Sequence, residues 1–368
     1  MTRVMQASSR PSAGLFALAL VLAMPQPVSA GETATVGALK DYKDWVLGCD
    51  NGRACVAIGM TAEEGMLSAY LRLARAGEAD AAPSVALVLY PPDDAAAALA
   101  RPMVRLAFDG HGAEGRLAGA LPLERTGDLY RLDLPGDAVS DLLAGLSRAK
   151  ILTLDLYDGE ARRASEMVSL AGSTAALLAM DDQQKRVGTV TALARPGAAA
   201  ADTVPPVPAL PVVTSLPVGV MADPLPRPPR TAATPSPDGC FAGTPPYIAF
   251  SLPGGASLWG ACASAGAYNL AYDFRIFIGG KPGRPWDARV SGLTGFDETP
   301  SWLWNAYVDE ETRRLRSFMK GRGLGDCGDA TEWAFDGAGF VALSYSAMDA
   351  CRGVMQEDWP VLYRARAE

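Results

Sequence analysis

Histidine is almost absent: the 368-residue chain has one, His111. Catalytic triads of the Ser-His-Asp and Cys-His kinds use histidine as their general base, so any such triad would need this residue. His111 lies in the glycine-rich stretch Asp109-Gly-His-Gly-Ala-Glu-Gly115, which is typical of a solvated loop. The sequence therefore leaves catalysis open but does not favour it.

Basic residues are outnumbered, with 33 Lys and Arg against 41 Asp and Glu and a formal net charge of −8. No basic stripe with interleaved aromatic residues offsets this excess. An acidic chain is repelled by phosphate backbones, and nucleic-acid binding needs clustered cations that release counterions. We therefore expect no nucleic-acid partner.

Long hydrophobic runs are missing as well. The run from Gly14 to Met24 has eleven residues, whereas a membrane-spanning helix needs about 20. Arg3 and Arg10 precede this run, and the small residues Val28-Ser-Ala30 follow it. This order predicts a secretory signal peptide over residues 1–30, cleaved after Ala30, and no transmembrane segment in the mature chain. Abundant alanine and more arginine than lysine suit a Gram-negative bacterium with a GC-rich genome, so we expect a periplasmic or secreted protein.

No C-x-x-C pair occurs, which argues against a structural zinc site, and we expect no metal and no cofactor. An oxidising compartment favours disulfides among an even number of cysteines, although six cysteines allow 15 connectivities. We favour pairing in sequence order because two cysteines precede a proline-rich stretch and four follow it. The expected pairs are Cys49–Cys55, Cys240–Cys262 and Cys327–Cys351.

Proline is concentrated in one place, since residues 196–237 hold twelve of the 28 prolines. Proline lacks an N–H and fixes φ, so this stretch predicts a partly polyproline linker. It separates two segments that are each long enough to bury a core. The expected organisation is a signal peptide (1–30), an N-terminal β-rich domain with two helices (31–195), the linker (196–237) and a C-terminal antiparallel β domain (238–368).

The N-terminal segment predicts a hairpin over Asp44–Ile58, with Asn51-Gly52 at its turn and Cys49 and Cys55 beside it. Alternating apolar residues predict further strands, such as Val104–Phe108 and Ile151–Leu156. Apolar residues at helical spacing predict one helix through Val139–Leu146 and a second helix that begins at Ser173. We expect an antiparallel sheet, or β-sandwich, covered by two helices.

The C-terminal segment contains six of the seven tryptophans and no amphipathic run of helical length. Residues 302–308 and 315–319 predict one hairpin, and residues 333–335 and 340–343 predict another. A final strand is expected over residues 359–364. The fold class that we predict for the whole chain is therefore mainly β.

The stretch Gly321-Arg-Gly-Leu-Gly325 resembles a phosphate loop, but no helix is predicted after it. Arg322 would supply the positive charge for an anion. Asp326 and Asp329 could reach one calcium ion, yet the stretch lacks the alternating oxygen ligands of a dedicated site. The candidate binding loop consists of Arg322, Asp326, Asp329, Trp333 and Asp336.

Longer motifs carry a family resemblance. They are the Trp45–Cys55 hairpin, Met180-Asp-Asp-Gln-Gln-Lys-Arg-Val-Gly-Thr-Val-Thr-Ala192, Cys262-Ala-Ser-Ala-Gly-Ala-Tyr-Asn269, Gly321-Arg-Gly-Leu-Gly-Asp-Cys-Gly328, Trp333-Ala-Phe-Asp-Gly337, Phe340, Cys351-Arg-Gly353 and Trp359-Pro360. Together they resemble domain-of-unknown-function family 1176. The resemblance implies a secreted bacterial protein with cysteine pairs and no established activity.

We therefore favour a non-catalytic binding or envelope-accessory module whose partner is an envelope protein or polymer. The alternative is a carboxylate-based hydrolase that acts on envelope glycans, since such enzymes need two positioned carboxyl groups. Asp181-Asp182 and Asp309-Glu-Glu311 supply neighbouring acids, which we interpret as solvated. A purely structural envelope protein is a third possibility.

Overall fold

The computed structural model describes Met1 and residues 36–62, 68–91, 99–221, 224–229, 232–236, 238–279, 281–285 and 302–368. Apart from Met1, the predicted signal peptide lies outside these residues. The chain from Ala34 to Glu368 forms one compact unit.

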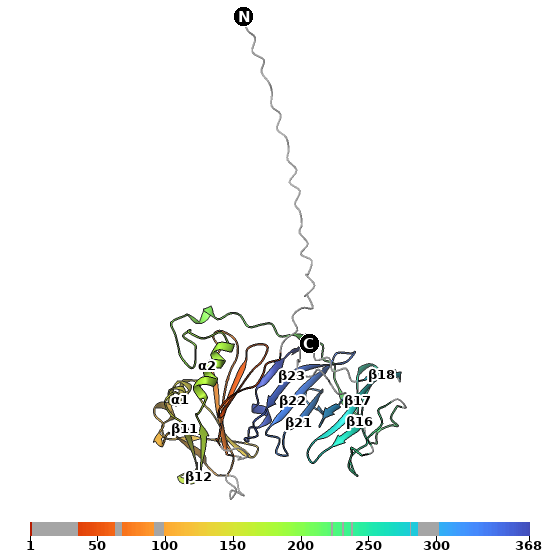
Figure 1. Ribbon diagram of the computed structural model, residues 1–368, viewed down its shortest axis with the longest axis horizontal. Coiled ribbons are helices and arrows are strands. Elements are labelled where there is room, and N and C mark those ends of the chain that lie inside the picture. Colours follow the sequence, from red (N-terminus) through yellow and green to blue (C-terminus); the bar gives the residue numbers. More distant parts are fainter. Residues whose placement is uncertain are drawn as a thin grey trace. The chain divides into compact units, whose positions relative to one another are not determined.

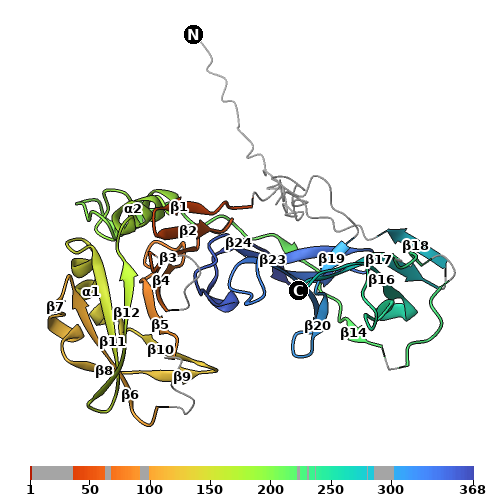
Figure 2. The same cartoon turned by 60° about the horizontal axis from the view of Figure 1, so that its bottom comes forward.

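The N-terminal half contains a seven-stranded sheet in the order β1-β2-β3-β4-β5-β10-β9, with every neighbouring pair antiparallel. Its strands, several of which are labelled in Figure 2, are β1 (Lys40–Tyr42), β2 (Trp45–Cys49), β3 (Cys55–Met60), β4 (Ala69–Arg75), β5 (Ser84–Leu89), β9 (Glu124–Thr126) and β10 (Leu129–Asp133).

A second antiparallel sheet in this half has the order β12-β11-β6-β7, and β8 also pairs with β6. Its strands are β6 (Pro102–Phe108), β7 (His111–Gly112), β8 (Ala120–Pro122), β11 (Ile151–Asp158) and β12 (Ala161–Ser169). The two predicted helices are confirmed as α1 (Val139–Leu146) and α2 (Ser173–Gln183), and 3-10 turns lie at Gly115–Leu117 and Gly136–Ala138.

Both sheets and both helices share one hydrophobic core. Alternate residues of the strands enter it, for example Leu71 and Leu73 of β4 and Leu152 and Leu154 of β11. The helices add their periodic apolar residues to the same core. The core side chains contributed by α1 and α2 are Val139, Leu142, Leu146, Ala176, Leu177 and Met180.

The hairpin of β2 and β3 is confirmed, but its turn differs from the prediction. Cys49 and Cys55 lie opposite each other, so the loop has five residues rather than a two-residue Asn-Gly turn. The side chain of Asp50 accepts hydrogen bonds from the N–H groups of Gly52 (2.8 Å) and Ala54 (2.9 Å), and the positive φ falls on Arg53. Side-chain capping by the aspartate therefore replaces the expected glycine conformation.

The C-terminal half contains two more antiparallel sheets, several strands of which are labelled in Figure 1. The first comprises β14 (Gly219–Val220), β15 (Tyr247–Ser251), β16 (Ser257–Ala265), β17 (Leu270–Ile278), β18 (Lys281–Pro285) and β19 (Trp302–Trp304). The second comprises β20 (Tyr307–Asp309), β21 (Arg314–Lys320), β22 (Gly328–Phe335), β23 (Phe340–Met348) and β24 (Val361–Arg364). Short 3-10 turns lie at Pro253–Gly255 and Gln356–Asp358.

The core of this half lies between its two sheets and contains Phe250 and Phe274 from one sheet and Trp333, Phe335 and Phe340 from the other. The predicted hairpin of β22 and β23 is confirmed.

The other predicted hairpin of this half is only partly right, because β19 pairs with β17 in the neighbouring sheet and only β20 pairs with β21. Between β19 and β20, Asn305 has a φ of 45°. The Asn305 side chain donates to the carbonyl of Phe318 (2.8 Å) and accepts from the N–H of Leu270 (2.9 Å). These bonds fix the point at which the chain passes from the first C-terminal sheet to the second.

The described parts of the proline-rich segment are extended and contact both halves. Arg53 donates to the carbonyls of Pro205 and Pro206. Val212–Val213 forms β13, which pairs in parallel with β25 (Arg366–Ala367) near the C-terminus. A 3-10 turn lies at Ala201–Thr203, and β14 is the edge strand of the first C-terminal sheet.

The two halves also share a hydrophobic cluster. Every residue of β3 is buried because both faces of the strand are covered. One face enters the N-terminal core, and the other, with Val56, Ile58 and Met60, packs with Val354 and Trp359 of the C-terminal half.

The sheets described above confirm the prediction of a mainly β fold. The division into two domains stays a prediction.

Candidate functional site

The predicted loop places Arg322 and Asp326 in a two-pronged ion pair. Nε of Arg322 lies 2.7 Å from Oδ1 of Asp326, and a terminal guanidinium nitrogen lies 2.5 Å from Oδ2. Asp326 also accepts a 2.7 Å hydrogen bond from the N–H of Gly353. Burial opposes ionisation, but the hydrogen bonds from Arg322 and Gly353 outweigh it and hold the pKa of Asp326 below its usual value.

The glycines of this loop serve close packing and backbone geometry. A Cβ on Gly321 would lie 2.7 Å from the sulfur of Cys327, and one on Gly328 would lie 2.0 Å from the carbonyl oxygen of Met319. Gly328 has a φ of 133°, which side chains rarely allow. Because β22 begins at Gly328, the loop leads into a strand and not into the helix of a phosphate loop.

The other predicted site residues are spread along β22 and its turn. Burial and the nearby charge of Asp349 raise the pKa of Asp329 to about 6. Trp333 is buried and donates to the hydroxyl of Ser317 (3.0 Å). Asp336 accepts from the N–H groups of Ala338 and Gly339, both at 2.8 Å. Seven positions separate Asp329 from Asp336, roughly 20 Å along a strand, so these side chains do not meet in one site.

Arg322 instead faces a pocket of about 620 Å³ built from both halves of the chain. The N-terminal half contributes β1, β2, β3 and the turn between β1 and β2, and the C-terminal half contributes the predicted loop and the segment after β23. The lining residues are Asp41, Lys43, Val46, Met60, Arg322, Asp349, Ala350, Cys351 and Arg352. We refer to it as the basic pocket because it holds three cationic side chains.

Two of these cations are held by carboxylates that do not themselves line the pocket. Arg352 lies 3.0 Å from Asp44 and also donates to the carbonyl of Thr61 (3.2 Å). Arg322 is held by Asp326. A guanidinium carries five N–H donors, so Arg322 retains donors beyond its two bonds to Asp326.

The third cation, Lys43, is exposed and lies in the turn between β1 and β2 with a φ of 57°. It makes no hydrogen bond or ion pair within the described part of the chain. Among the cations, only Arg322 was a predicted site residue. Arg352 lies within a family motif, and no sequence signal pointed to Lys43.

Three disulfides are formed, Cys49–Cys55, Cys240–Cys262 and Cys327–Cys351, and they are the expected pairs. Cys327–Cys351 joins the predicted loop to the segment after β23. Since Cys351 lines the basic pocket, this bond ties two of its walls together.

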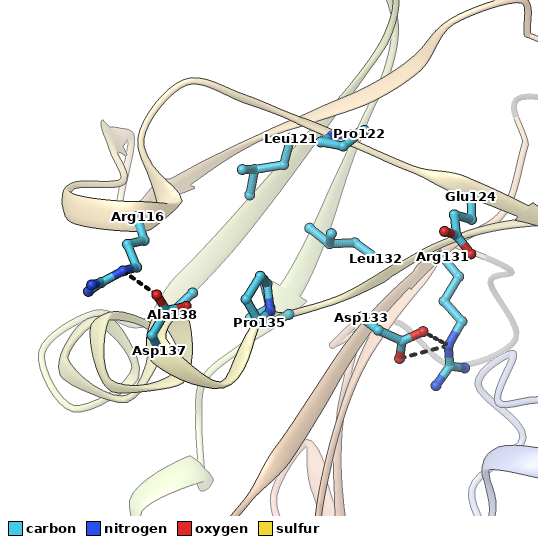
Figure 3. A pocket seen from close by; sticks show the side chains of 11 residues that line it. Arg116, Leu121, Pro122, Glu124, Arg131, Leu132, Asp133, Pro135, Asp137 and Ala138 are labelled. Atoms are coloured by element: carbon cyan, nitrogen blue, oxygen red, sulfur yellow. Dashed lines mark hydrogen bonds and ion pairs between the residues drawn. The ribbon is translucent and has the colours of Figure 1, made fainter.

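A second pocket, of about 340 Å³, lies in the N-terminal half (Figure 3). Its walls are mostly apolar and include Leu121, Leu132 and Pro135. Two ion pairs lie at its rim: Arg116 with Asp137 at 2.7 Å, and Arg131 with Asp133 at 3.0 Å. These pairs neutralise four of the five charged lining residues, and Glu124 is the fifth.

His111 is exposed on the two-residue strand β7. Within the described ranges, no three His, Cys, Asp or Glu side chains gather as a metal site would require. In the same ranges, neither helix has the length and apolar character needed to cross a bilayer.

Comparison with known proteins places these features in a family. The model for "Protein of unknown function (DUF1176)" matches residues 39–366. The chain is 30% identical over 353 residues to the "Uncharacterized protein YpfG" of Escherichia coli (strain K12), which covers 89% of this chain and 93% of that protein. No solved structure matches. The chain therefore belongs to the DUF1176 family.

Proposed function

We propose that this protein is a non-catalytic binding module of the bacterial envelope, and that the basic pocket holds an anionic group of an envelope polymer or protein. The observation that supports this most strongly is the convergence of Lys43, Arg322 and Arg352 on one pocket. These three cations lie beside two carboxylates of the same lining, Asp41 and Asp349, on a chain with a net charge of −8.

The chemistry of these cations favours a carboxylate or a phosphate. Arginine presents planar sets of N–H donors that match both groups, and lysine adds a mobile point charge. The carboxylates of Asp326 and Asp44 orient the two guanidinium groups before any ligand arrives. Such preorganisation lowers the entropic cost of binding.

The pocket walls are also held in place covalently. The Cys327–Cys351 bond and the pairing of Asp326 with the N–H of Gly353 limit the movement of the C-terminal wall. Three disulfides agree with export to the periplasm or the cell exterior, where thiols are oxidised. A Gram-negative envelope offers suitable anions as carboxylates of peptidoglycan and phosphates of lipopolysaccharide.

Pelleting with isolated envelope polymers tests this function. Purified protein is incubated with insoluble peptidoglycan or with lipopolysaccharide vesicles, and the bound fraction and any released fragments are measured. We expect salt-sensitive binding to at least one polymer and no released product. Release of fragments would contradict a non-catalytic role. Failure to bind either polymer would contradict the proposal that the pocket holds a carboxylate of peptidoglycan or a phosphate of lipopolysaccharide.

One observation favours the hydrolase as a second candidate. Asp349 lines the basic pocket and contributes to raising the pKa of Asp329 to about 6. A carboxyl whose pKa is raised by burial and by a second carboxyl nearby is an arrangement that acid–base hydrolysis uses. Fragment release in the pelleting experiment that is lost in the Asp349→Asn variant would support this candidate. Undiminished release in that variant would place the chemistry elsewhere.

A further inference from the structure

A groove of about 450 Å³ crosses the face of the second C-terminal sheet, apart from the basic pocket. The register places Tyr307 of β20 opposite Arg316, Arg316 opposite Glu332, and Glu332 opposite Ser344. Opposite residues of an antiparallel sheet point to the same side, so these four side chains form one row across the face.

The groove is hollow because its floor is made of small residues. Ala330 and Ser346 lie opposite each other in the next row of the same face. Tyr307 lies on one side of the floor, and Gln356 and Glu357 of the 3-10 turn before β24 also line the groove. The volume falls within the range of small-ligand sites.

Most of the charge in the groove is already neutralised. Glu332 lies 2.9 Å from Arg316 and 2.5 Å from Arg314. An anion would have to compete with Glu332 for Arg316, whereas a neutral ligand would not. The ion pairs also hold the Glu332 carboxylate and the Arg316 guanidinium in fixed orientations.

Several polar groups retain free hydrogen-bonding capacity. The hydroxyls of Ser344 and Ser346 and the side-chain amide of Gln356 have no hydrogen-bond partner among the residues that the structure describes. Tyr307 is 45% exposed and presents its ring at the edge of the sheet. An aromatic ring beside hydroxyl and amide groups is suited to a sugar, whose ring has apolar C–H faces and peripheral hydroxyls.

We propose that this groove binds a neutral oligosaccharide, with the Tyr307 ring against a sugar face and Glu332, Ser344, Ser346 and Gln356 bonded to its hydroxyls. The site is separate from the basic pocket and does not depend on the function proposed for it.

Calorimetric titration of the mature, oxidised protein with β-1,4-linked tetrasaccharides of glucose and of N-acetylglucosamine tests the proposal. We expect measurable binding of at least one of them. Tyr307→Ala should weaken it about tenfold, or about 1.4 kcal/mol, because it removes the aromatic contact with the sugar face. Tyr307→Phe should bind like the wild type because it keeps the ring. Ser344→Leu should abolish binding, because the leucine side chain would occupy space in the groove beside Glu332.

Tyr268→Ala is the matched control, because Tyr268 is 42% exposed in the same half but does not line the groove. Its binding should equal that of the wild type, and thermal melting confirms that each variant is folded. Failure of the wild type to bind either tetrasaccharide at millimolar concentration would overturn the proposal. Equal sugar binding by the wild type, Tyr307→Ala and Ser344→Leu would also overturn the proposal, because the sugar would then bind outside the groove. Occupation of the groove by a second copy of the chain would give the same result.

Discussion

The hydroxyl of Tyr70 donates a 2.6 Å hydrogen bond to the carboxylate of Asp358, which lies 288 positions later in the chain. The same carboxylate lies 3.0 Å from Arg131 and 3.3 Å from Arg72. Asp358 is 4% exposed and borders the hydrophobic cluster shared by the two halves. One acidic side chain from the C-terminal half thus satisfies three polar groups of the N-terminal sheet.

Asp358→Ala should lower the free energy of unfolding by about 3–5 kcal/mol, because it leaves the buried Tyr70 hydroxyl unpaired and removes the carboxylate that Arg72 and Arg131 share. Denaturant unfolding followed by tryptophan fluorescence measures the change. Asp133→Ala is the control, since the Asp133 side chain is 68% exposed and shares Arg131. Its cost should stay below about 1 kcal/mol. Equal costs for the two variants would contradict the role given to Asp358.

Asp181 and Asp182 are neighbours in sequence with opposite environments. Asp181 is fully buried, lies 2.6 Å from Arg75 and accepts from the N–H groups of Leu193 (2.8 Å) and Ala194 (2.9 Å), whereas Asp182 is exposed. We expect Asp181→Ala to cost about 3–5 kcal/mol and Asp182→Ala less than about 0.5 kcal/mol. Thermal or denaturant unfolding of both variants measures this, and a ranking in the reverse order would be incompatible with the buried network.

Asp329 should make stability depend on pH in a specific window. Its pKa rises from 3.8 to about 6 on folding, so the folded state holds the proton more tightly than the unfolded state. The resulting contribution to stability is present in full below about pH 4 and is lost as the pH rises through about 6. Relative to Asp329→Asn, the wild type should therefore lose about 3 kcal/mol in all as the pH rises from below 4 to above 6.

Unfolding free energies of the wild type and Asp329→Asn at several pH values test this dependence. Asp128→Asn is the control because the Asp128 side chain is fully exposed, and its difference from the wild type should stay flat across the same range. A flat difference for Asp329→Asn as well would show that burial and Asp349 do not act on this carboxyl as described.

The Cys327–Cys351 bond should matter for both stability and the basic pocket. Replacing both cysteines by serine opens a loop with a sequence separation of 24 and should cost about 3.5 kcal/mol. Removing Cys240–Cys262, with a separation of 22, should cost a similar amount. Only the first double variant should lose binding to envelope polymers under native conditions. Equal loss in both would mean that the bond supports the fold and not the pocket.

Local features were predictable from the sequence, and features that depend on distant residues were not. The β2–β3 and β22–β23 hairpins and both helices follow from short-range patterns, and the disulfide pairs follow from the order of the cysteines around the proline-rich stretch. Asp181 was wrongly interpreted as solvated because its partner, Arg75, lies 106 positions away. Trp302–Trp304 was assigned to the wrong sheet for a similar reason, since its partner strand precedes it by about 30 residues.

The candidate site shows the same limit. Arg322 was identified from a glycine-rich motif, but its position beside Lys43 and Arg352 arises only when the two halves pack together. The sequence around Lys43 does not indicate a binding site, because an exposed lysine in a turn has the same neighbours in sequence whether or not a pocket lies beside it. Asp336 was grouped with Arg322 by sequence proximity, which an extended strand does not preserve.

A matched pair of lysine variants tests most directly whether the basic pocket binds an anion. Lys43 and Lys185 are both exposed and have φ values of 57° and 59°, but only Lys43 lines the pocket. Asparagine tolerates this backbone conformation, so Lys43→Asn and Lys185→Asn remove one charge each with little strain.

The measurement is the dissociation constant for the envelope polymer that pellets with the wild type. Our account predicts that Lys43→Asn weakens binding about fivefold, in line with the loss of about 1 kcal/mol from one exposed charge contact, and that Lys185→Asn leaves it unchanged. Equal affinities for the wild type and both variants would contradict it.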